Sequence, residues 1–481
     1  MNKTWIGAAL LLLGAGFLFS QANQPTQTTT SDPFPTPIPA TDRVITVKFA
    51  EFATIPDFNG AAPRIMTMAY EPGTKGFFAS DMNGRLFAVS ADGKTVTEYL
   101  DLRAPEWNVA VQAQNSERGF QSFAFHPQFS QRGSRGFGKF YTYGDSTNTT
   151  VPADFKPSGG NHTHDTVLLE WTAKDPAASK YDGVAPREVL RFEQPFANHN
   201  AGHLSFNPLA RAGDAEFGLL YFGLADGGSG GDPLGHAQNL NSAFGKILRI
   251  DPLGNNSANK KYGIPPANPF ANDGRDDTLG EIYASGVRNA QRLFWDSKNG
   301  NMFMSDIGQD TVEKISQVTP GANLGWNAWE GSFRFVRGGR GSQVNPADPR
   351  SDSKVTYPIV EYGQQDPLLM NSSAAIGGMV YRNSRIPQLN NLLIFGDNPS
   401  GEIFYVSADN LPKGGQDAIR RVLLNDGGTS KTFLQVIKEK NTAQGKTPAT
   451  RADLRFGEGP DGQIFLLNKR DGIIRVLVPG T

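Results

Sequence analysis

One segment, residues 198–204, contains residue types that could carry out acid–base chemistry. It reads Asn-His-Asn-Ala-Gly-His-Leu and leads into an apolar run that starts at His203. A neutral imidazole accepts a proton near neutral pH, so His199, at the entrance of an expected strand, is a candidate general base. The spacing leaves a solvent-exposed turn histidine as the alternative.

Two further segments could handle charge. Arg288 and Asn289 stand immediately before another apolar run, where an arginine could hold an anionic group or stabilise developing negative charge. A plain surface arginine is the alternative there. Residues 306–310, Asp-Ile-Gly-Gln-Asp, offer carbonyl and carboxylate oxygens of the kind that bind hard cations.

Two other polar segments are weaker candidates. The glycine-rich loop at 225–233 lacks the Lys-Ser/Thr pair of a P-loop, which argues against a phosphate cradle. Its Asp226 and Asp232 could bind Ca²⁺ through oxygen atoms, or the loop could be only a structural turn. Residues 161–165, Asn-His-Thr-His-Asp, have a single adjacent acid and lead into a plain strand, so no metal is expected there.

Composition excludes several classes of function. The 481 residues include 46 Lys and Arg and 47 Asp and Glu, which gives a net charge of −1. No block of like charge stands out, so nothing favours nucleic acid as a partner. The absence of cysteine rules out disulfides, thiol catalysis, c-type haem attachment and thiolate metal sites, and any redox chemistry needs a separate cofactor.

The N-terminus predicts export. Residues 1–22 have the order of a secretory signal, with Lys3, an apolar run over 5–19 and the small-residue site Ser20-Gln21-Ala22. The apolar run is shorter than the ~20 residues that cross a bilayer, so cleavage is favoured over an uncleaved anchor. The mature chain is then secreted or periplasmic with no membrane span, and the Thr- and Pro-rich residues 23–43 are predicted to be a disordered linker.

Short β-rich runs bounded by Gly, Asn, Asp and Pro indicate an all-β fold. Six modules recur, with first strands at 64–70, 122–127, 203–206, 292–295, 378–381 and 454–457. Radial repetition hides sheet edges, so residues 44–481 are predicted to form a six-bladed β-propeller; two β-sandwiches are the alternative. The strand at 44–49 is expected to close the ring in the last blade. Insertions at 227–241 and 340–366 are expected to build the site on one face.

Several ordered stretches resemble the glucose/sorbosone dehydrogenase family. They are residues 117–127, 199–204, 226–233, 288–289, 308–309 and 321–326. This family includes pyrroloquinoline quinone (PQQ) glucose dehydrogenases, aldose sugar dehydrogenases and hedgehog-interacting-protein-like propellers. The resemblance covers roughly residues 64–477. It implies an exported sugar dehydrogenase that moves hydride from the sugar C1 carbon to PQQ beside a Ca²⁺ ion, with an electron acceptor that the sequence does not identify.

The resemblance also implies a role for individual residues. His199 would take the proton of the sugar C1 hydroxyl, and Arg288 would stabilise charge on the quinone. The remaining implied contacts are Glu117, Asn289, Arg451 and Arg455 with PQQ, and the carbonyls of Gly308 and Gln309 with Ca²⁺.

The sequence departs from the glucose dehydrogenases at three places. Residues 396–401, Gly-Asp-Asn-Pro-Ser-Gly, lack the fifth-blade lysine and match the hedgehog-interacting-protein-like version. Arg451 and Arg455 are shifted in register. Glu117 replaces a neutral amide, and its carboxylate would repel those of PQQ unless it is paired.

These departures leave two other functions open. One is a non-catalytic propeller that binds carbohydrate or protein on the same face. The other is a Ca²⁺-dependent lactonase-like hydrolase, which is an analogy at the level of the fold. A hydrolase of that kind needs carboxylates and Asn repeated on successive inner strands, and the sequence shows no such ring.

Overall fold

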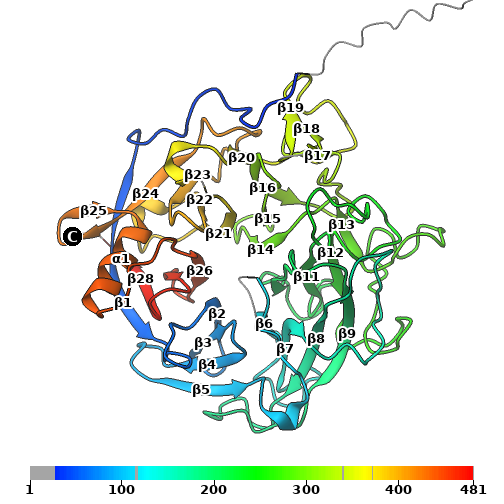
Figure 1. Ribbon diagram of the computed structural model, residues 1–481. Helices are drawn as coiled ribbons and strands as arrows, with labels where there is room; N and C mark the ends of the chain where they lie inside the picture. The colour runs from blue at the N-terminus through cyan, green and yellow to red at the C-terminus, as the bar shows by residue number, and fades with distance from the viewer. Residues whose placement is uncertain (1–27, 114–116, 339–340, 371, 480–481) are drawn as a thin grey trace, which may run out of the picture.

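The computed structural model describes residues 28–113, 117–338, 341–370 and 372–479. The predicted signal peptide, residues 1–22, lies outside the described residues. Small antiparallel sheets are arranged in a ring, with β6, β14, β21 and β26 among the strands nearest the centre (Figure 1). The all-β prediction is confirmed, and the arrangement is that of a propeller.

Four sheets have four strands each, paired antiparallel in chain order. The first comprises β2 (Ile65–Glu71), β3 (Gly76–Asp81), β4 (Arg85–Val89) and β5 (Val96–Asp101). The second comprises β6 (Phe120–Phe125), β7 (Lys139–Ser146), β8 (His164–Thr172) and β9 (Arg187–Gln194). The third comprises β10 (Leu204–Phe206), β11 (Leu220–Leu224), β12 (Lys246–Ile250) and β13 (Ile282–Ser285). The fourth comprises β14 (Ala290–Trp295), β15 (Met302–Asp306), β16 (Val312–Val318) and β20 (Val360–Gly363).

A larger sheet joins the two ends of the chain. Its order is β21 (Ala375–Tyr381), β22 (Leu392–Asp397), β23 (Ile403–Ser407), β24 (Arg420–Asp426), β1 (Ile45–Thr54), β28 (Ile473–Val478), β27 (Ile464–Leu467) and β26 (Arg455–Glu458), with β25 (Thr429–Lys431) on β24. Strand β1 runs parallel to β24 and antiparallel to β28. The prediction that residues 44–49 pair with the last strands is therefore confirmed, and this pairing covers edges that would otherwise be open.

A small three-stranded sheet packs against the fourth sheet. It contains β17 (Trp329–Glu330), β18 (Phe333–Val336) and β19 (Gln343–Asn345). The segment 340–366, predicted to be a loop insertion, therefore includes β19 and β20. Strand β20 reads Val-Glu-Tyr-Gly and is buried at every position. The strand is short and has polar residues on either side, so the sequence contains no periodic pattern that would predict it.

The start of the described chain is packed, which corrects the prediction of a disordered linker over 23–43 for residues 28–43. The Phe34 ring meets Phe333 of β18 edge-on, with centroids 5.6 Å apart. Ile38 is buried, and its N–H donates to Asp366 at 2.7 Å. The Pro-rich composition suits this placement because an extended segment with few backbone donors leaves few groups unsatisfied.

The strands bury both faces because each sheet packs between two neighbours. Strand β11, Leu-Tyr-Phe-Gly-Leu, is buried at every position. A Cβ atom on its Gly223 would lie 2.7 Å from Ala290 Cβ, so glycine allows β11 to approach the next sheet closely.

The described residues contain one α-helix, α1 (Phe433–Ala443), which follows β25. Thr432 and Gln435 form a capping box at its start, and Phe433, Leu434 and Ile437 are among its buried residues. Single 3₁₀ turns occupy η1 (Pro105–Trp107), η2 (Pro367–Leu369) and η3 (Pro387–Leu389). Within the described ranges, no helix has the length and apolar character needed to cross a membrane.

Candidate functional site

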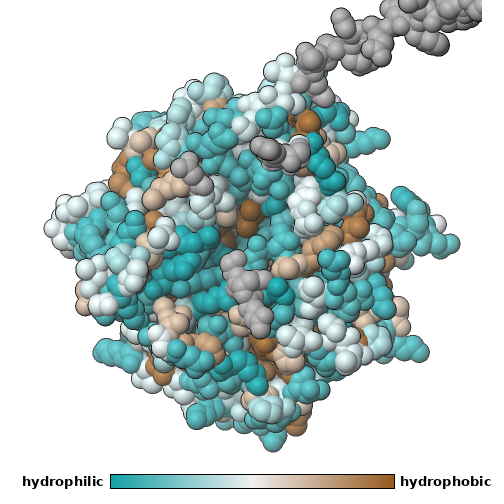
Figure 2. All heavy atoms as spheres, in the orientation of Figure 1, coloured by the Kyte–Doolittle hydropathy of each residue, from teal (hydrophilic) through white to brown (hydrophobic). Residues whose placement is uncertain are grey.

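The topology gathers distant segments at one end of the sheets. In a four-stranded antiparallel sheet, the loop before the first strand and the loop between the second and third strands lie at the same end. Such loops line a cavity of about 1010 Å³. Mostly hydrophilic side chains surround the middle of this face (Figure 2).

Every residue predicted for the site lines this cavity. They are Glu117, His199, Arg288, Asn289, Gly308, Gln309, Arg451 and Arg455. The fold therefore brings together all eight positions, which come from loops spread over 339 residues of sequence (117 to 455). Their individual roles stay predictions.

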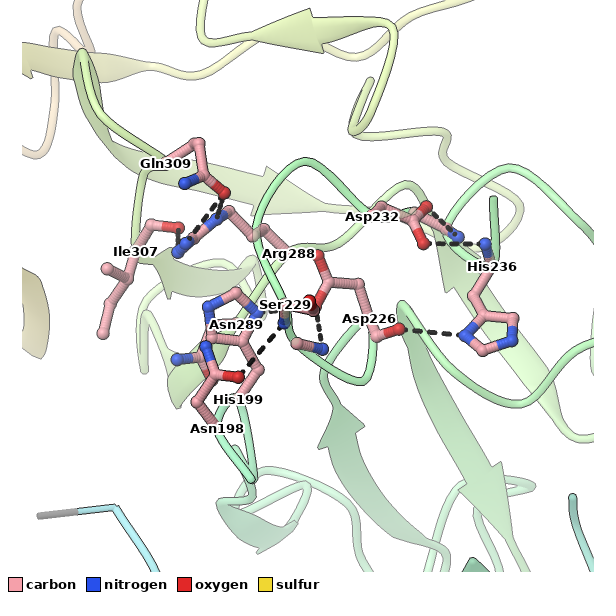
Figure 3. Close-up of polar contacts among 12 residues, drawn as sticks. Asn198, His199, Asp226, Ser229, Asp232, His236, Arg288, Asn289, Ile307 and Gln309 are labelled. Atoms are coloured by element: carbon pink, nitrogen blue, oxygen red, sulfur yellow. Dashed lines mark hydrogen bonds and ion pairs between the residues drawn. The ribbon is translucent and has the colours of Figure 1, made fainter. Parts of the chain in front are cut away.

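His199 is held by a carboxylate on one side of its ring. Its Nδ1 lies 2.6 Å from Asp226 Oδ1 (Figure 3), and the residue is only 5% exposed, which excludes the alternative of an exposed turn histidine. Asp226 also accepts from the N–H of Gly228 at 2.9 Å and from Trp326 Nε1 at 2.8 Å. Burial opposes ionisation, but the attraction and hydrogen bond of His199 hold the pKa of Asp226 below its usual value.

This geometry corrects one reading of the glycine-rich loop. Asp226, a possible Ca²⁺ ligand by sequence, has its carboxylate bound by three N–H donors. With Asp226 accepting from Nδ1–H, His199 Nε2 is the nitrogen that can accept a proton. The pair has the base-and-orienter arrangement used in general base catalysis.

Glu117 also contacts the histidine segment. Its Oε2 accepts from the backbone N–H of His199 at 2.6 Å. The carboxylate that would repel an anionic cofactor is therefore engaged by the protein, and it fixes the chain at His199, whose φ is +60°.

Arg288 and Gln309 form a second pair on the cavity wall. Arg288 Nε and Nη2 donate to Gln309 Oε1 at 3.2 and 3.1 Å, and Nη1 donates to the Ile307 carbonyl at 3.0 Å (Figure 3). Asp306 Oδ1 accepts the backbone N–H groups of Arg288 and Asn289. These contacts aim a guanidinium into the cavity from a rigid strand junction.

The turn at Gly308 and Gln309 is stabilised by Glu330 from the small sheet. Glu330 Oε1 accepts four consecutive backbone N–H groups, from residues 309–312, at 2.8 to 3.2 Å. No sequence signal linked Glu330 to this turn.

The predicted calcium position fits poorly on this chain's own groups. Ca²⁺ takes 6–8 oxygen ligands, and in the described residues no three His, Cys, Asp or Glu side chains are grouped for a metal. The Gln309 side-chain oxygen is occupied by Arg288 and by the Gly231 N–H. Binding by the carbonyls of Gly308 and Gln309 stays a prediction, and most of the oxygens would have to come from a ligand and water.

The loop from Asp226 to Lys246 is held by a buried lysine. Lys246 Nζ donates to the carbonyls of His236, Ala237 and Phe244 at 2.8 to 3.1 Å. His236 Nδ1 in turn lies 3.0 Å from the Asp226 carbonyl. Asp232 accepts from the N–H groups of His236 and Ala237 at 2.9 Å, so it serves the structural turn rather than a calcium site.

The substitution Lys246→Met is expected to change how stability varies with pH. Burial lowers the pKa of Lys246 to about 7, against 10.5 for an ordinary lysine. Between these values the unfolded chain binds one more proton than the folded chain. The free energy of unfolding therefore gains up to ~1.4 kcal/mol per pH unit as the pH rises, and loses it as the pH falls towards 7.

Urea unfolding at pH 7.5 and pH 9.5 tests this linkage. The gain in free energy of unfolding between the two pH values should be smaller in Lys246→Met than in the wild type. Lys298→Met, which removes an exposed lysine paired with Asp409, should keep the wild-type gain. Equal gains in all three proteins would refute the linkage.

The remaining histidines lie away from this cavity or below it. His126, expected in a turn, is buried, and burial lowers its pKa to about 4. His203 Nδ1 accepts from the Leu293 N–H at 3.4 Å beneath the cavity. In the segment 161–165, His162 Nε2 lies 2.8 Å from Asp165, which also binds Arg191, so ion pairs account for the pattern.

Three basic residues of the cavity were missed by the sequence analysis. They are Arg64, Lys469 and Arg470. Lys469 and Arg470 occupy the turn between β27 and β28, a position equivalent to that of Gln309 in the fourth sheet. That equivalence is the signal that could have identified them.

The comparisons with known proteins agree with this architecture. A family model described as Glucose / Sorbosone dehydrogenase matches residues 62–475. This chain belongs to the glucose/sorbosone dehydrogenase family. It is 33% identical to the HIPL1 protein of Arabidopsis thaliana over 315 residues, 59% of this chain and 43% of the relative. It is 26% identical to the Hedgehog-interacting protein of Mus musculus over 329 residues, 68% of this chain and 39% of the relative.

Solved structures of sugar dehydrogenases share the fold. The PQQ-bound aldose sugar dehydrogenase of Streptomyces coelicolor aligns with a TM-score of 0.56 at 20% identity, covering 90% of this chain and 98% of the other. The soluble aldose sugar dehydrogenase of Escherichia coli, in its apo form, aligns with a TM-score of 0.60 at 18% identity, covering 90% and 99%. The chain spans less than half the length of the two curated relatives named above.

Proposed function

We propose that this protein is an exported, PQQ-dependent aldose dehydrogenase that oxidises the C1 hydroxyl of a sugar. The observation that carries the proposal is the His199–Asp226 pair at 2.6 Å, placed in the same cavity as Arg288 and Asn289. In this proposal the large sheet contributes two blades, β21–β24 and β26–β28 with β1. The propeller then has six.

The cavity residues fit a tricarboxylate cofactor. Six cationic side chains line the cavity against two carboxylates; the cations are Arg64, Arg288, Arg451, Arg455, Lys469 and Arg470. Burial lowers the pKa of Arg455 to about 10, and a bound anion would favour its charged form. When bound, PQQ would supply the two-electron acceptor for the hydride.

The protein's own residues would prepare the sugar for this transfer. His199 Nε2 accepts the proton of the C1 hydroxyl, and Asp226 keeps the ring oriented and stabilises the imidazolium that forms. Arg288 would stabilise the negative charge that develops on the group that accepts the hydride. Glu117 holds the backbone of His199, so the base does not have to be ordered during the reaction.

Addition of PQQ with Ca²⁺ is expected to raise the melting temperature and to allow reduction of an artificial dye by aldoses. A ligand that binds only the folded state stabilises it by about 2.7 kcal/mol at one hundred times its dissociation constant. Differential scanning fluorimetry and a dye-reduction assay over a sugar panel measure the two effects. The same titration with EGTA in place of Ca²⁺ shows whether the metal is required. If neither the melting temperature nor dye reduction responds to PQQ with Ca²⁺, the proposed function is wrong.

A second candidate is a non-catalytic propeller that binds carbohydrate or protein on the same face. Similarity to a protein named for hedgehog interaction, that of Mus musculus, favours it. Under this candidate His199→Ala should leave ligand binding intact, and PQQ should not change the melting temperature.

A further inference from the structure

One side of the cavity concentrates positive charge. Arg64 lies just before β2, Lys469 and Arg470 lie between β27 and β28, and Arg451 and Arg455 flank the start of β26. Five cations from three loops thus face the same space. Strands β2 and β26 lie next to each other in the ring, and β11 and β14 lie further round it (Figure 1).

Two carboxylates are among the described residues that line the cavity with these cations. Of the residues that line the cavity, Glu117 binds the His199 amide, and Asp453 is the other carboxylate. Asp453 Oδ1 lies 2.6 Å from Arg451 Nε, and its Oδ2 pairs with Arg470 Nη2. Although burial opposes ionisation, the attraction of Lys469, Arg451 and Arg470 holds the pKa of Asp453 below its usual value. Asp453 therefore serves several of these cations, and Asp81, whose Oδ1 accepts the Arg64 N–H, also attracts Arg64.

Each of these cations destabilises the charged form of its neighbours. Burial lowers the pKa of Lys469 well below that of a free lysine, and repulsion from Arg455, Arg64 and Arg451 lowers it further. Arg292, buried beneath the cavity, adds to the repulsion felt by Arg455. A protein keeps such a cluster at a cost in stability, which an anionic ligand would offset.

The turn after β22 orients one of these cations. The stretch 396–401 carries no lysine, and its Asn398 Oδ1 instead accepts from Arg451 Nη2 at 3.1 Å. Asn398 thus orients an arginine, while the lysine of this cavity comes from the turn after β27.

We propose that Arg64, Lys469 and Arg470 form an anion subsite that takes a carboxylate group of the ligand bound in this cavity. Where that carboxylate belongs to PQQ, the subsite rests on the proposed function. The same chemistry is offered by an acidic sugar such as a uronate. Both sources present planar carboxylates that a guanidinium binds through two hydrogen bonds.

The test uses three probes, namely citrate, PQQ and D-glucuronate, with D-glucose as the neutral match for glucuronate. Kd is measured by isothermal titration calorimetry at 50 and 200 mM NaCl for the wild type, Lys469→Met, Arg470→Gln and Lys469→Arg. Lys469→Met should raise the Kd of a carboxylate probe by at least about tenfold, since a charge-assisted hydrogen bond contributes ~1.5–3 kcal/mol. Lys469→Arg should retain most of the affinity, and Lys298→Met, on the outer surface, should retain all of it.

The melting temperature separates loss of the subsite from loss of the fold. Without ligand, Lys469→Met should melt at or above the wild-type temperature because a desolvated, repelled cation is removed. Weakened PQQ binding would assign the subsite to the cofactor, and weakened glucuronate binding alone would assign it to the substrate.

The proposed function and the subsite can fail separately. If the wild type ignores PQQ but binds citrate or glucuronate through Lys469, the PQQ function falls and the subsite stands. If PQQ binds equally well to the wild type, Lys469→Met and Arg470→Gln, and glucuronate is also unaffected, the subsite falls. The subsite proposal would also be overturned if citrate, PQQ and D-glucuronate all fail to bind the wild type at about 10 mM, a concentration that detects even weak sites.

Discussion

The substitution His199→Gln is expected to lower kcat for the proposed PQQ-dependent sugar oxidation by about 10²–10⁴-fold, the usual contribution of a general base. A glutamine amide fills similar space but cannot accept the C1 hydroxyl proton at its position. KM should change little because the cationic side chains that line the cavity are untouched. Steady-state dye reduction with the best aldose of the panel measures both constants.

Two controls assign this loss to proton transfer. His162→Gln removes a histidine that pairs with Asp165 outside the cavity, and its kcat should equal that of the wild type. His199→Ala opens room for a small base, so added imidazole should restore part of the rate. Retention of more than about a tenth of the wild-type kcat in His199→Gln would exclude His199 as the base, since general base catalysis supplies at least ~100-fold.

The substitution Asp226→Asn is expected to lower kcat on the order of 10²–10⁴-fold while the cavity persists. Asp226 accepts from His199 Nδ1, Gly228 N and Trp326 Nε1, and an asparagine offers only one acceptor oxygen for these three donors. Its amide N–H₂ would face Nδ1 and favour the wrong tautomer, in which Nε2 carries the proton. A triad aspartate replaced by asparagine shows a loss of about 10⁴-fold for this reason.

A matched variant separates orientation of the base from order of the loop. Asp232→Asn is the matched control, because Asp232 caps the same loop through His236 and Ala237 without touching His199. An equal loss of kcat in both variants would mean that loop order, and not orientation of the base, is what Asp226 provides.

Much of the fold could be predicted from local patterns. Each predicted first strand coincides with a strand of the structure, as at 64–70 with β2 and 454–457 with β26. Apolar runs of strand length bounded by turn residues are a local property, and the repeat makes the ring the natural way to bury them. The pairing of β1, which contains residues 45–49, with β28 followed because a ring leaves one edge to close.

Packing against distant segments could not be predicted. The Thr- and Pro-rich composition of residues 28–43 indicates disorder, yet Ile38 finds a buried partner in Asp366, 328 residues away. The loop assigned to 340–366 concealed β20, because a strand of four residues with polar flanks gives little periodicity.

The residue types of the site were determined by the sequence, and its chemistry by the tertiary structure. On spacing alone, His199 reads as an exposed turn histidine rather than a base. It becomes a candidate base only because Asp226, 27 residues later, reaches its Nδ1 when the second and third strands of the same sheet bring their loop to the cavity. Arg64 and Lys469 stand near opposite ends of the chain and share one charged cluster because β1 and β28 close the ring. Interactions of this range depend on closure of the whole ring, which no window of sequence contains.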